Sequence, residues 1–176
     1  LWVGTHGGGL NRLRDGKFSG ITKRDGLSHT FVKTVAGDAD GNVWIGTYGG
    51  GLNRLKDGKV TVVRAADGLA TDLVRTILPA RDGSVWVGTT SGLSVLRGGR
   101  VTTYRPADGL GGPAVNSLLE GRDGTIWAGT GGGLTRIGGG KLVNLTTREG
   151  LSSDPVSALL EDRAGTLWVG TYGAGR

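Results

Sequence analysis

Tryptophan recurs at a nearly constant spacing through the whole chain. The five tryptophans of this 176-residue sequence are separated by 42, 42, 41 and 41 residues, and each opens a Trp-(Val/Ile/Ala)-Gly-Thr tetrapeptide: Trp2, Trp44, Trp86, Trp127 and Trp168. A second marker, an acidic residue followed by Gly-Leu, keeps the same period at Asp25, Asp67, Asp108 and Glu149. Two markers with one period indicate an array of similar supersecondary units.

Each period contains four short apolar segments separated by turn residues. In one period these are residues 74–78, 84–88, 93–96 and 100–104. The dipeptides Asp40-Gly41, Asp82-Gly83 and Asp123-Gly124 predict two-residue type I′ hairpin turns, which need positive φ at both central residues. No stretch has a sustained 3.6-residue apolar period, so we expect essentially no helix.

Four short antiparallel strands repeated at this spacing are typical of a propeller blade. The sequence therefore predicts an all-β fold, a β-propeller of four-stranded antiparallel blades with a 41–42 residue repeat. A tryptophan at one fixed place in each blade is suited to fill the space between facing sheets. The glycine two positions later indicates a point where the neighbouring backbone leaves no room for a Cβ.

The strand order along the chain predicts an incomplete arc of about four blades rather than a closed ring. We expect a partial blade at residues 1–30, blades at 31–72, 73–113 and 114–154, and a second partial blade at 155–176. Because the chain has no initiator Met and starts inside a strand, we also expect a piece of a longer protein. Uncovered strand edges favour pairing with the remaining blades of the parent chain or self-association.

Composition excludes several kinds of chemistry. There are no Cys and only two His, which rules out disulfides, thiolate zinc sites and cysteine nucleophiles. No apolar run is long enough to cross a bilayer. The net charge of +6 favours contact with polyanions, but the basic residues are scattered singly and predict no specific nucleic-acid site.

The full repeat resembles the two-component regulator propeller family. The resemblance is carried by Asp25-Gly26-Leu27, by residues 40–47 and by Gly-Gly-Leu-Asn-Arg-Leu at 50–55, and it recurs along the chain. It implies a non-catalytic sensor propeller on the periplasmic or extracellular side of a bacterial receptor, whose parent chain carries a histidine kinase or diguanylate cyclase output. Two departures, Ser91-Gly92-Leu93-Ser94-Val95 and Glu149, are interpreted as repeat drift.

The candidate ligand residues lie in two sets of loops expected on one face of the propeller, where loops vary over a rigid scaffold. One set supplies His6, Tyr48 and Tyr172, the other supplies His29 and Asp72, and Arg75 follows on an inner strand at the position that Lys33 occupies one repeat earlier. Family resemblance adds a glycan fragment as a ligand class, on which Tyr48 and Tyr172 would stack. The same divergence among repeats is also what neutral drift predicts.

No catalytic set, metal site or cofactor site is predicted. Neither histidine has a partner at ligand spacing, and the periodic acids Asp25, Asp67, Asp108 and Glu149 are expected to accept hydrogen bonds from nearby backbone N–H groups. Two other readings stay open. One is a propeller lyase or glycosidase with an active site at the channel mouth, and the other is a scaffold that docks a protein or a polyanion.

Overall fold

The chain folds into five antiparallel sheets whose strands follow one another in chain order. The computed structural model describes residues 1–173, so the last three residues of the expected segment 155–176 lie outside the described part. The first sheet has three strands: β1 (Trp2–Gly4), β2 (Leu10–Arg14) and β3 (Lys17–Ile21). The last sheet has two: β16 (Val156–Glu161) and β17 (Leu167–Thr171).

The three sheets between them have four strands each. The second sheet comprises β4 (Val32–Gly37), β5 (Val43–Thr47), β6 (Leu52–Lys56) and β7 (Lys59–Val63). The third comprises β8 (Val74–Pro79), β9 (Val85–Thr89), β10 (Leu93–Arg97) and β11 (Arg100–Tyr104). The fourth comprises β12 (Val115–Glu120), β13 (Ile126–Thr130), β14 (Gly133–Gly138) and β15 (Lys141–Leu145).

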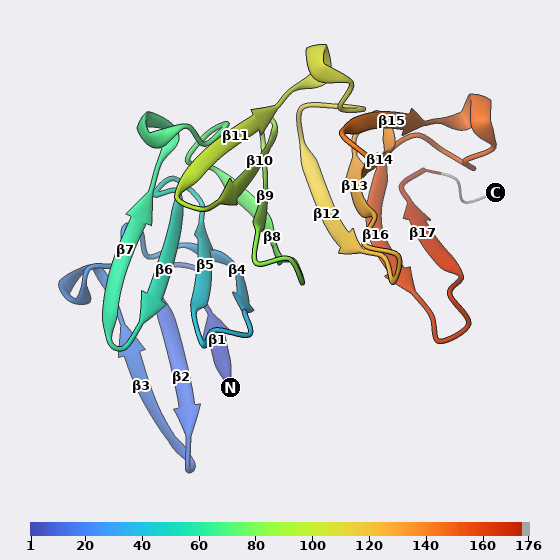
Figure 1. Ribbon diagram of the computed structural model, residues 1–176. Coiled ribbons are helices and arrows are strands. Elements are labelled where there is room, and N and C mark those ends of the chain that lie inside the picture. Colours follow the sequence, from blue (N-terminus) through green and yellow to red (C-terminus); the bar gives the residue numbers. More distant parts are fainter. Residues whose placement is uncertain (174–176) are drawn as a thin grey trace.

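The sheets are arranged like successive blades around an axis. The first strands of the second to fifth sheets, β4, β8, β12 and β16, contact one another in sequence order, and β1 contacts β4. Figure 1 shows the sheets following one another along an open arc, with β1 at one end and β17 at the other. The all-β partial propeller expected from the repeat is therefore confirmed.

Apolar side chains pack between successive sheets rather than within one central core. One cluster joins the first and second sheets around Leu10 and Ile45, a second joins the second and third around Trp44 and Val87, and a third joins the third and fourth around Trp86. Trp44 and Trp86 are buried and fill the space between facing sheets, as the sequence predicted. Each interface thus depends on the sheet that follows.

The repeated glycine makes room for a side chain rather than for backbone, which corrects the expectation from the sequence. A Cβ on Gly46 would lie 2.5 Å from Cγ1 of Val74, and one on Gly88 would lie 2.8 Å from Cγ1 of Val115. These valines belong to β8 and β12, the first and innermost strands of the following sheets, and they are fully buried. The close approach is therefore a valine methyl seated on a glycine.

The type I′ turns predicted at Asp40-Gly41, Asp82-Gly83 and Asp123-Gly124 are wrong in position. In these five-residue loops the glycine has positive φ and the aspartate does not. Oδ1 of Asp38 accepts from the N–H groups of Asp40 and Asn42, at 3.0 and 2.9 Å, and so stabilises the longer loop. Positive φ at both central residues occurs instead in the outer hairpins, at residues 15–16, 57–58, 98–99 and 139–140.

Each connection between sheets contains a short 3₁₀ turn, which the sequence did not predict. The turns are η1 (Lys23–Asp25), η2 (Ala65–Asp67), η3 (Pro106–Asp108) and η4 (Thr147–Glu149). A carboxylate ends each turn and accepts from the backbone N–H three residues earlier, for example from Thr22 to Asp25 at 2.8 Å and from Thr146 to Glu149 at 2.7 Å. These carboxylates make the backbone contacts expected from the sequence.

Candidate functional site

The two loop sets that carry the candidate residues meet on one face of the arc. The N–H of Tyr48, in the loop between β5 and β6, donates to the carbonyl of Phe31 at 3.0 Å. The N–H groups of Gly49 and Gly51 both donate to the carbonyl of Asp72 at 3.0 Å. The connection between sheets and the loop between second and third strands are therefore joined by backbone hydrogen bonds.

An aromatic row crosses this loop face where the first sheet meets the second. The ring centroids of His6 and Phe31 lie 3.9 Å apart, and those of Phe31 and Tyr48 lie 5.5 Å apart. Nδ1 of His29 accepts from the N–H of Phe31 at 3.0 Å. His6, His29 and Tyr48 are thus gathered around Phe31, and Tyr48 is 38% exposed.

Phe31 is the residue of this row that sequence reasoning missed. It precedes the first inner strand, where the later repeats have Leu73, Ala114 and Pro155. Its aromatic side chain among aliphatic ones was the available signal. The predicted set contained aromatic residues from both loop sets but not the one that joins them.

The carboxylate of Asp72 serves its own loop. Oδ1 of Asp72 accepts from the N–H of Ala65 at 2.7 Å, and Oδ1 of Asp154, two repeats later, accepts from Thr147 at 2.6 Å. A contact that recurs in this way belongs to the architecture of the repeat. The backbone carbonyl of Asp72 contributes equally, because it anchors the loop that follows Tyr48.

Arg75 lies at a β-bulge near the start of β8, on the inner strand of the third sheet. Its Nε is enclosed and has no hydrogen-bond partner among the described residues. At the same bulge one repeat later, Nδ2 of Asn116 donates to the carbonyl of Val156 at 2.9 Å. Asn116 thus satisfies its donor at this position, whereas Nε of Arg75 does not. A buried donor without a partner costs free energy.

Tyr172 stands at the repeat position of Tyr48 but in different surroundings. It follows β17, at the end of the arc opposite to β1 (Figure 1). Its backbone N–H donates to the carbonyl of Pro155 at 2.7 Å, and the residue as a whole is 79% exposed. The structure therefore gathers Tyr48 with the two histidines and leaves Tyr172 apart.

The electrostatics of the described residues favour ionised carboxylates. Backbone and hydroxyl hydrogen bonds from Thr22 lower the pKa of Asp25, and those from Thr146 lower the pKa of Glu149. Burial alone would raise the pKa of Asp38, but hydrogen bonds from the indole of Trp44 and from Asn42 outweigh it and leave that pKa lowered. Each of the six displaced carboxyl pKa values is shifted downward, which is the opposite of what a general acid needs.

Within residues 1–173, no three His, Cys, Asp or Glu side chains lie together as a set that could hold a metal ion. None of the helical segments in the described chain has the length and apolar character needed to cross a bilayer.

Sequential four-stranded blades with a common loop face define a β-propeller architecture. The two component regulator propeller model matches residues 26–49, 68–91, 109–132 and 150–173, and the chain belongs to that family. No curated protein matches the chain.

Solved structures of similar fold include bacterial receptor domains. The extracellular domain of the putative hybrid two component system BT3049 from B. thetaiotaomicron superposes with a TM-score of 0.82 at 23% identity, over 97% of this chain and 25% of that one. The extracellular domain of the putative one component system BT4673 from the same organism gives a TM-score of 0.77 at 23% identity, over 98% of this chain and 27% of that one. The chain thus spans about a quarter of these receptor domains.

An enzyme shares the fold as well. Catalytically inactive virginiamycin B lyase from Staphylococcus aureus superposes with a TM-score of 0.68 at 14% identity, over 96% of this chain and 58% of the lyase. At such identities the likeness establishes the fold alone. Function must be argued from the residues of the loop face.

Proposed function

We propose that this chain is the ligand-sensing propeller segment of an extracytoplasmic bacterial two-component receptor and performs no chemistry itself. The observation that carries the proposal is the aromatic row of His6, Phe31 and Tyr48, which stands on the loop face of a two component regulator propeller. Membership of that family and the similarity to extracellular receptor domains support the role and the compartment.

The row favours a glycan fragment as the ligand. A sugar ring presents C–H groups on one face and hydroxyls at its rim, and an exposed aromatic ring offers a flat apolar surface to the former. Tyr48 is the most suitable platform, because its ring is partly exposed and its backbone is fixed by the hydrogen bond to Phe31. His6 and His29 supply hydrogen-bonding nitrogens beside it.

Arg75 and Lys33 extend this face toward the inner strands. They occupy successive bulges on β4 and β8, and Nε of Arg75 has no partner in the described chain. The positive charges of these two side chains would favour a ligand that carries a carboxylate or sulfate group. The loop face therefore suits acidic glycans better than neutral ones.

Sensing at this face would act through the packing of adjacent sheets. His6 belongs to the loop after β1, whereas Phe31 and Tyr48 belong to the second sheet and its approach. A ligand that contacts both sides stabilises one relative position of the two sheets. The ligand shifts the receptor's conformational equilibrium only to the extent that it binds this arrangement of the two sheets more tightly than other arrangements.

A thermal-shift screen with neutral and uronic-acid oligosaccharides tests the proposal. We expect at least one acidic oligosaccharide to raise the melting temperature of the wild-type chain and of Tyr172→Ala, but not of Tyr48→Ala. Tyr172 is the matched control because it has the same repeat position without the aromatic neighbours. An equal response of Tyr48→Ala would place binding elsewhere, and a panel without any response would contradict a glycan ligand.

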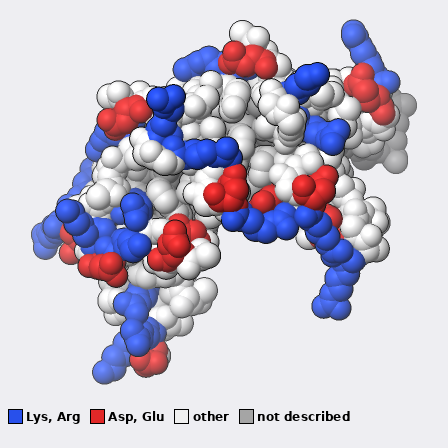
Figure 2. All heavy atoms as spheres, viewed as in Figure 1, with Lys and Arg blue, Asp and Glu red and all other residues white. Residues whose placement is uncertain are grey.

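The fold shared with virginiamycin B lyase keeps an enzyme as a second candidate. Turnover of a glycan that is lost in His6→Ala or His29→Ala would favour a lyase or glycosidase over a binding module. Docking of a polyanion would instead be strongly weakened by salt. Basic and acidic side chains are interspersed over the face seen in Figure 2, which favours small-ligand sensing over a polyanion.

A further inference from the structure

A cavity lies between the third and fourth sheets, away from the loop face. Its volume is about 550 Å³, and its apolar wall is formed by Trp86, Val95 and Tyr104 of the third sheet with Ile126 and Ile137 of the fourth. The outer hairpin of the fourth sheet, at residues 138–140, borders the opening. A cavity of this size with an apolar wall is within the range of small-molecule sites.

The cavity arises from one departure from the repeat. The residue paired with the tryptophan across the next strand is Arg12, Arg54 or Arg136 in three sheets, but Val95 in the third. In the first two sheets the guanidinium lies over the indole, 5.6 Å from the ring centroid of Trp2 and 5.8 Å from that of Trp44. Val95 is too short to cover Trp86 in this way.

The equivalent spaces beside Trp44 and Trp2 are smaller. The cavity next to Trp44 measures about 340 Å³ and the one next to Trp2 about 430 Å³. In both, the arginine that lies over the indole forms part of the lining. The loss of that arginine therefore accompanies the largest of the three cavities.

A second departure meets the first in the same cavity. Tyr104 occupies the strand position that Ile21, Val63 and Leu145 hold in the other sheets. Its ring lies parallel to that of Trp86 within 15°, with 6.3 Å between centroids. The third sheet thus has a valine and a tyrosine where the other sheets have an arginine and an aliphatic residue, and the rings of Trp86 and Tyr104 both line the cavity.

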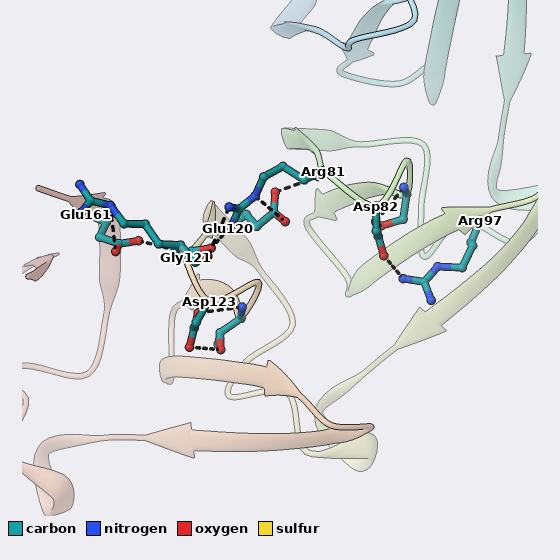
Figure 3. A network of polar contacts seen from close by, with 10 residues as sticks. Arg81, Asp82, Arg97, Glu120, Gly121, Asp123 and Glu161 are labelled. Carbon is teal, nitrogen blue, oxygen red and sulfur yellow. Dashed lines mark hydrogen bonds and ion pairs between the residues drawn. The ribbon is translucent and has the colours of Figure 1, made fainter. Parts of the chain in front are cut away.

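The charges at the rim leave one cation without a partner. Arg97 pairs with Asp82, and Arg81 pairs with Glu120 at 3.1 Å, as Figure 3 shows. Arg100, paired across the hairpin with Arg97, has no ion pair within the part of the chain that the structure describes. The two carboxylates at the rim are neutralised, so the guanidinium of Arg100 gives the opening a net positive charge.

We propose that this cavity binds a small amphiphilic anion, an aromatic or alicyclic carboxylate about the size of a substituted benzoate. The ring of the ligand packs against Trp86, Tyr104 and Ile137, and its carboxylate meets Arg100 at the opening. The site takes the apolar volume that a guanidinium fills in the first two sheets. It is independent of the loop face and of the function proposed for it.

Fluorine NMR with trifluoromethylbenzoate and its neutral carboxamide tests the proposal on the whole chain. For a ligand of this size we expect a dissociation constant on the order of 1 mM for the benzoate and about tenfold weaker binding of the carboxamide. The variant Val95→Arg restores the residue of the other repeats and places a guanidinium over the indole of Trp86, within the volume that the ligand ring would occupy. We expect it to fold normally and to lose at least about tenfold in affinity, since the apolar contacts are displaced.

Arg100→Gln removes the cation without changing the apolar wall of the cavity, and we expect it to weaken benzoate binding about fivefold or more. Lys59→Gln, at the same position of the second sheet's hairpin, is the matched control and should bind as the wild type does. The proposal would be overturned if Val95→Arg kept full affinity or if the carboxamide bound as tightly as the benzoate. It would also be overturned if the wild-type chain bound no benzoate at ligand concentrations several times the expected dissociation constant. Because Arg100 is exposed, its variant decides the question even if Val95→Arg does not fold.

Discussion

The sheets in the middle of the arc and the sheets at its ends carry nearly the same sequence but experience different surroundings. Trp44 and Trp86 are 8% and 7% exposed because a following sheet covers them, whereas Trp168, at the same repeat position, is 59% exposed. Leu160 beside it is 61% exposed, and Leu78 at the equivalent position is packed against an apolar cluster. The stability of a blade therefore depends on its neighbour as much as on its own residues.

Replacing a tryptophan by alanine gives the largest expected contrast between the two regions. We expect Trp44→Ala to lower the free energy of unfolding by about 3–5 kcal/mol, since it leaves a cavity between two sheets. Trp168→Ala should cost about 1 kcal/mol or less, because most of that side chain is already in water. Urea unfolding followed by circular dichroism measures both, and equal losses would contradict the comparison.

A side chain added at the repeated glycine tests the same difference between middle and end sheets, because it overpacks an interface only where a following sheet covers the glycine. A Cβ at Gly88 would lie 2.5 Å from Cγ2 of Thr76 and 2.8 Å from Cγ1 of Val115, whereas one at Gly170 meets nothing closer than 3.4 Å. We expect Gly88→Val to destabilise the chain by about 2 kcal/mol or more. Gly170→Val should stay within about 0.5 kcal/mol of the wild type in the same denaturation assay.

The sequence predicts the blades and the uncovered ends of the arc, but it does not predict the loop geometry or the contacts between sheets. The period of tryptophan and Asp-Gly-Leu predicts the strands, because it fixes which residues must alternate between core and turn. The turn type was misplaced because Asp38 stabilises a longer loop through its own carboxylate. Phe31 was missed, and the departure at residues 91–95 was interpreted as drift, because the aromatic row and the cavity beside Val95 both depend on contacts between residues of different sheets.

Acid should weaken the chain through carboxylates that hold its turns. The pKa values of Asp25, Asp82, Asp123 and Glu149 are lowered by backbone or hydroxyl hydrogen bonds. A lowered pKa in the folded state means that the stabilisation is complete above the ordinary carboxyl pKa of about 4 and is lost as the pH falls through the lowered values. We expect the melting temperature to be flat from about pH 7 to pH 5 and to fall below about pH 4.

The acid response separates turns in the middle of the arc from those at its end. Asp38 and Asp162 each accept from the indole of the following tryptophan, at 2.7 and 2.8 Å, but Trp44 is buried and Trp168 is exposed. Asp38→Asn should reduce the acid-dependent drop in melting temperature more than Asp162→Asn does. A larger effect from Asp162→Asn would contradict the idea that burial of the partner decides the value of the contact.

The exposed ends also make association between copies of the chain an expected outcome. Trp168 and Leu160 form one uncovered apolar face, and Leu1, Val3 and Phe18 are exposed on the first sheet. Ile45 and Val87, which occupy the repeat position of Val3 in the middle of the arc, are fully buried. We expect light scattering to give a mass that rises with protein concentration. Leu160→Glu should shift this mass toward that of the monomer. Val143→Glu, a control on the exposed last strand of the fourth sheet, should leave it unchanged.

The smallest expected effect concerns a set of arginine contacts on the side of the arc opposite to the loop face. Arg81 contacts Glu120 and the carbonyl of Gly121 in the next sheet, and Arg122 repeats this with Glu161 and the carbonyl of Asp162. Between the second and third sheets the two positions hold Ala39 and Pro79, which cannot form the contact. The interface around Trp44 is nevertheless buried as fully as the one around Trp86.

These contacts therefore align neighbouring sheets more than they stabilise them. The side chains of Arg81 and Arg122 are 58% and 59% exposed, and ion pairs in such surroundings contribute about 0–1 kcal/mol. We expect Arg122→Ala to cost about 0.5 kcal/mol in low salt and less in high salt. Arg163→Ala, at the equivalent position of the last sheet, should cost nothing measurable. A loss of several kcal/mol from Arg122→Ala in urea unfolding would show instead that the arginines, and not the tryptophans, hold adjacent sheets together.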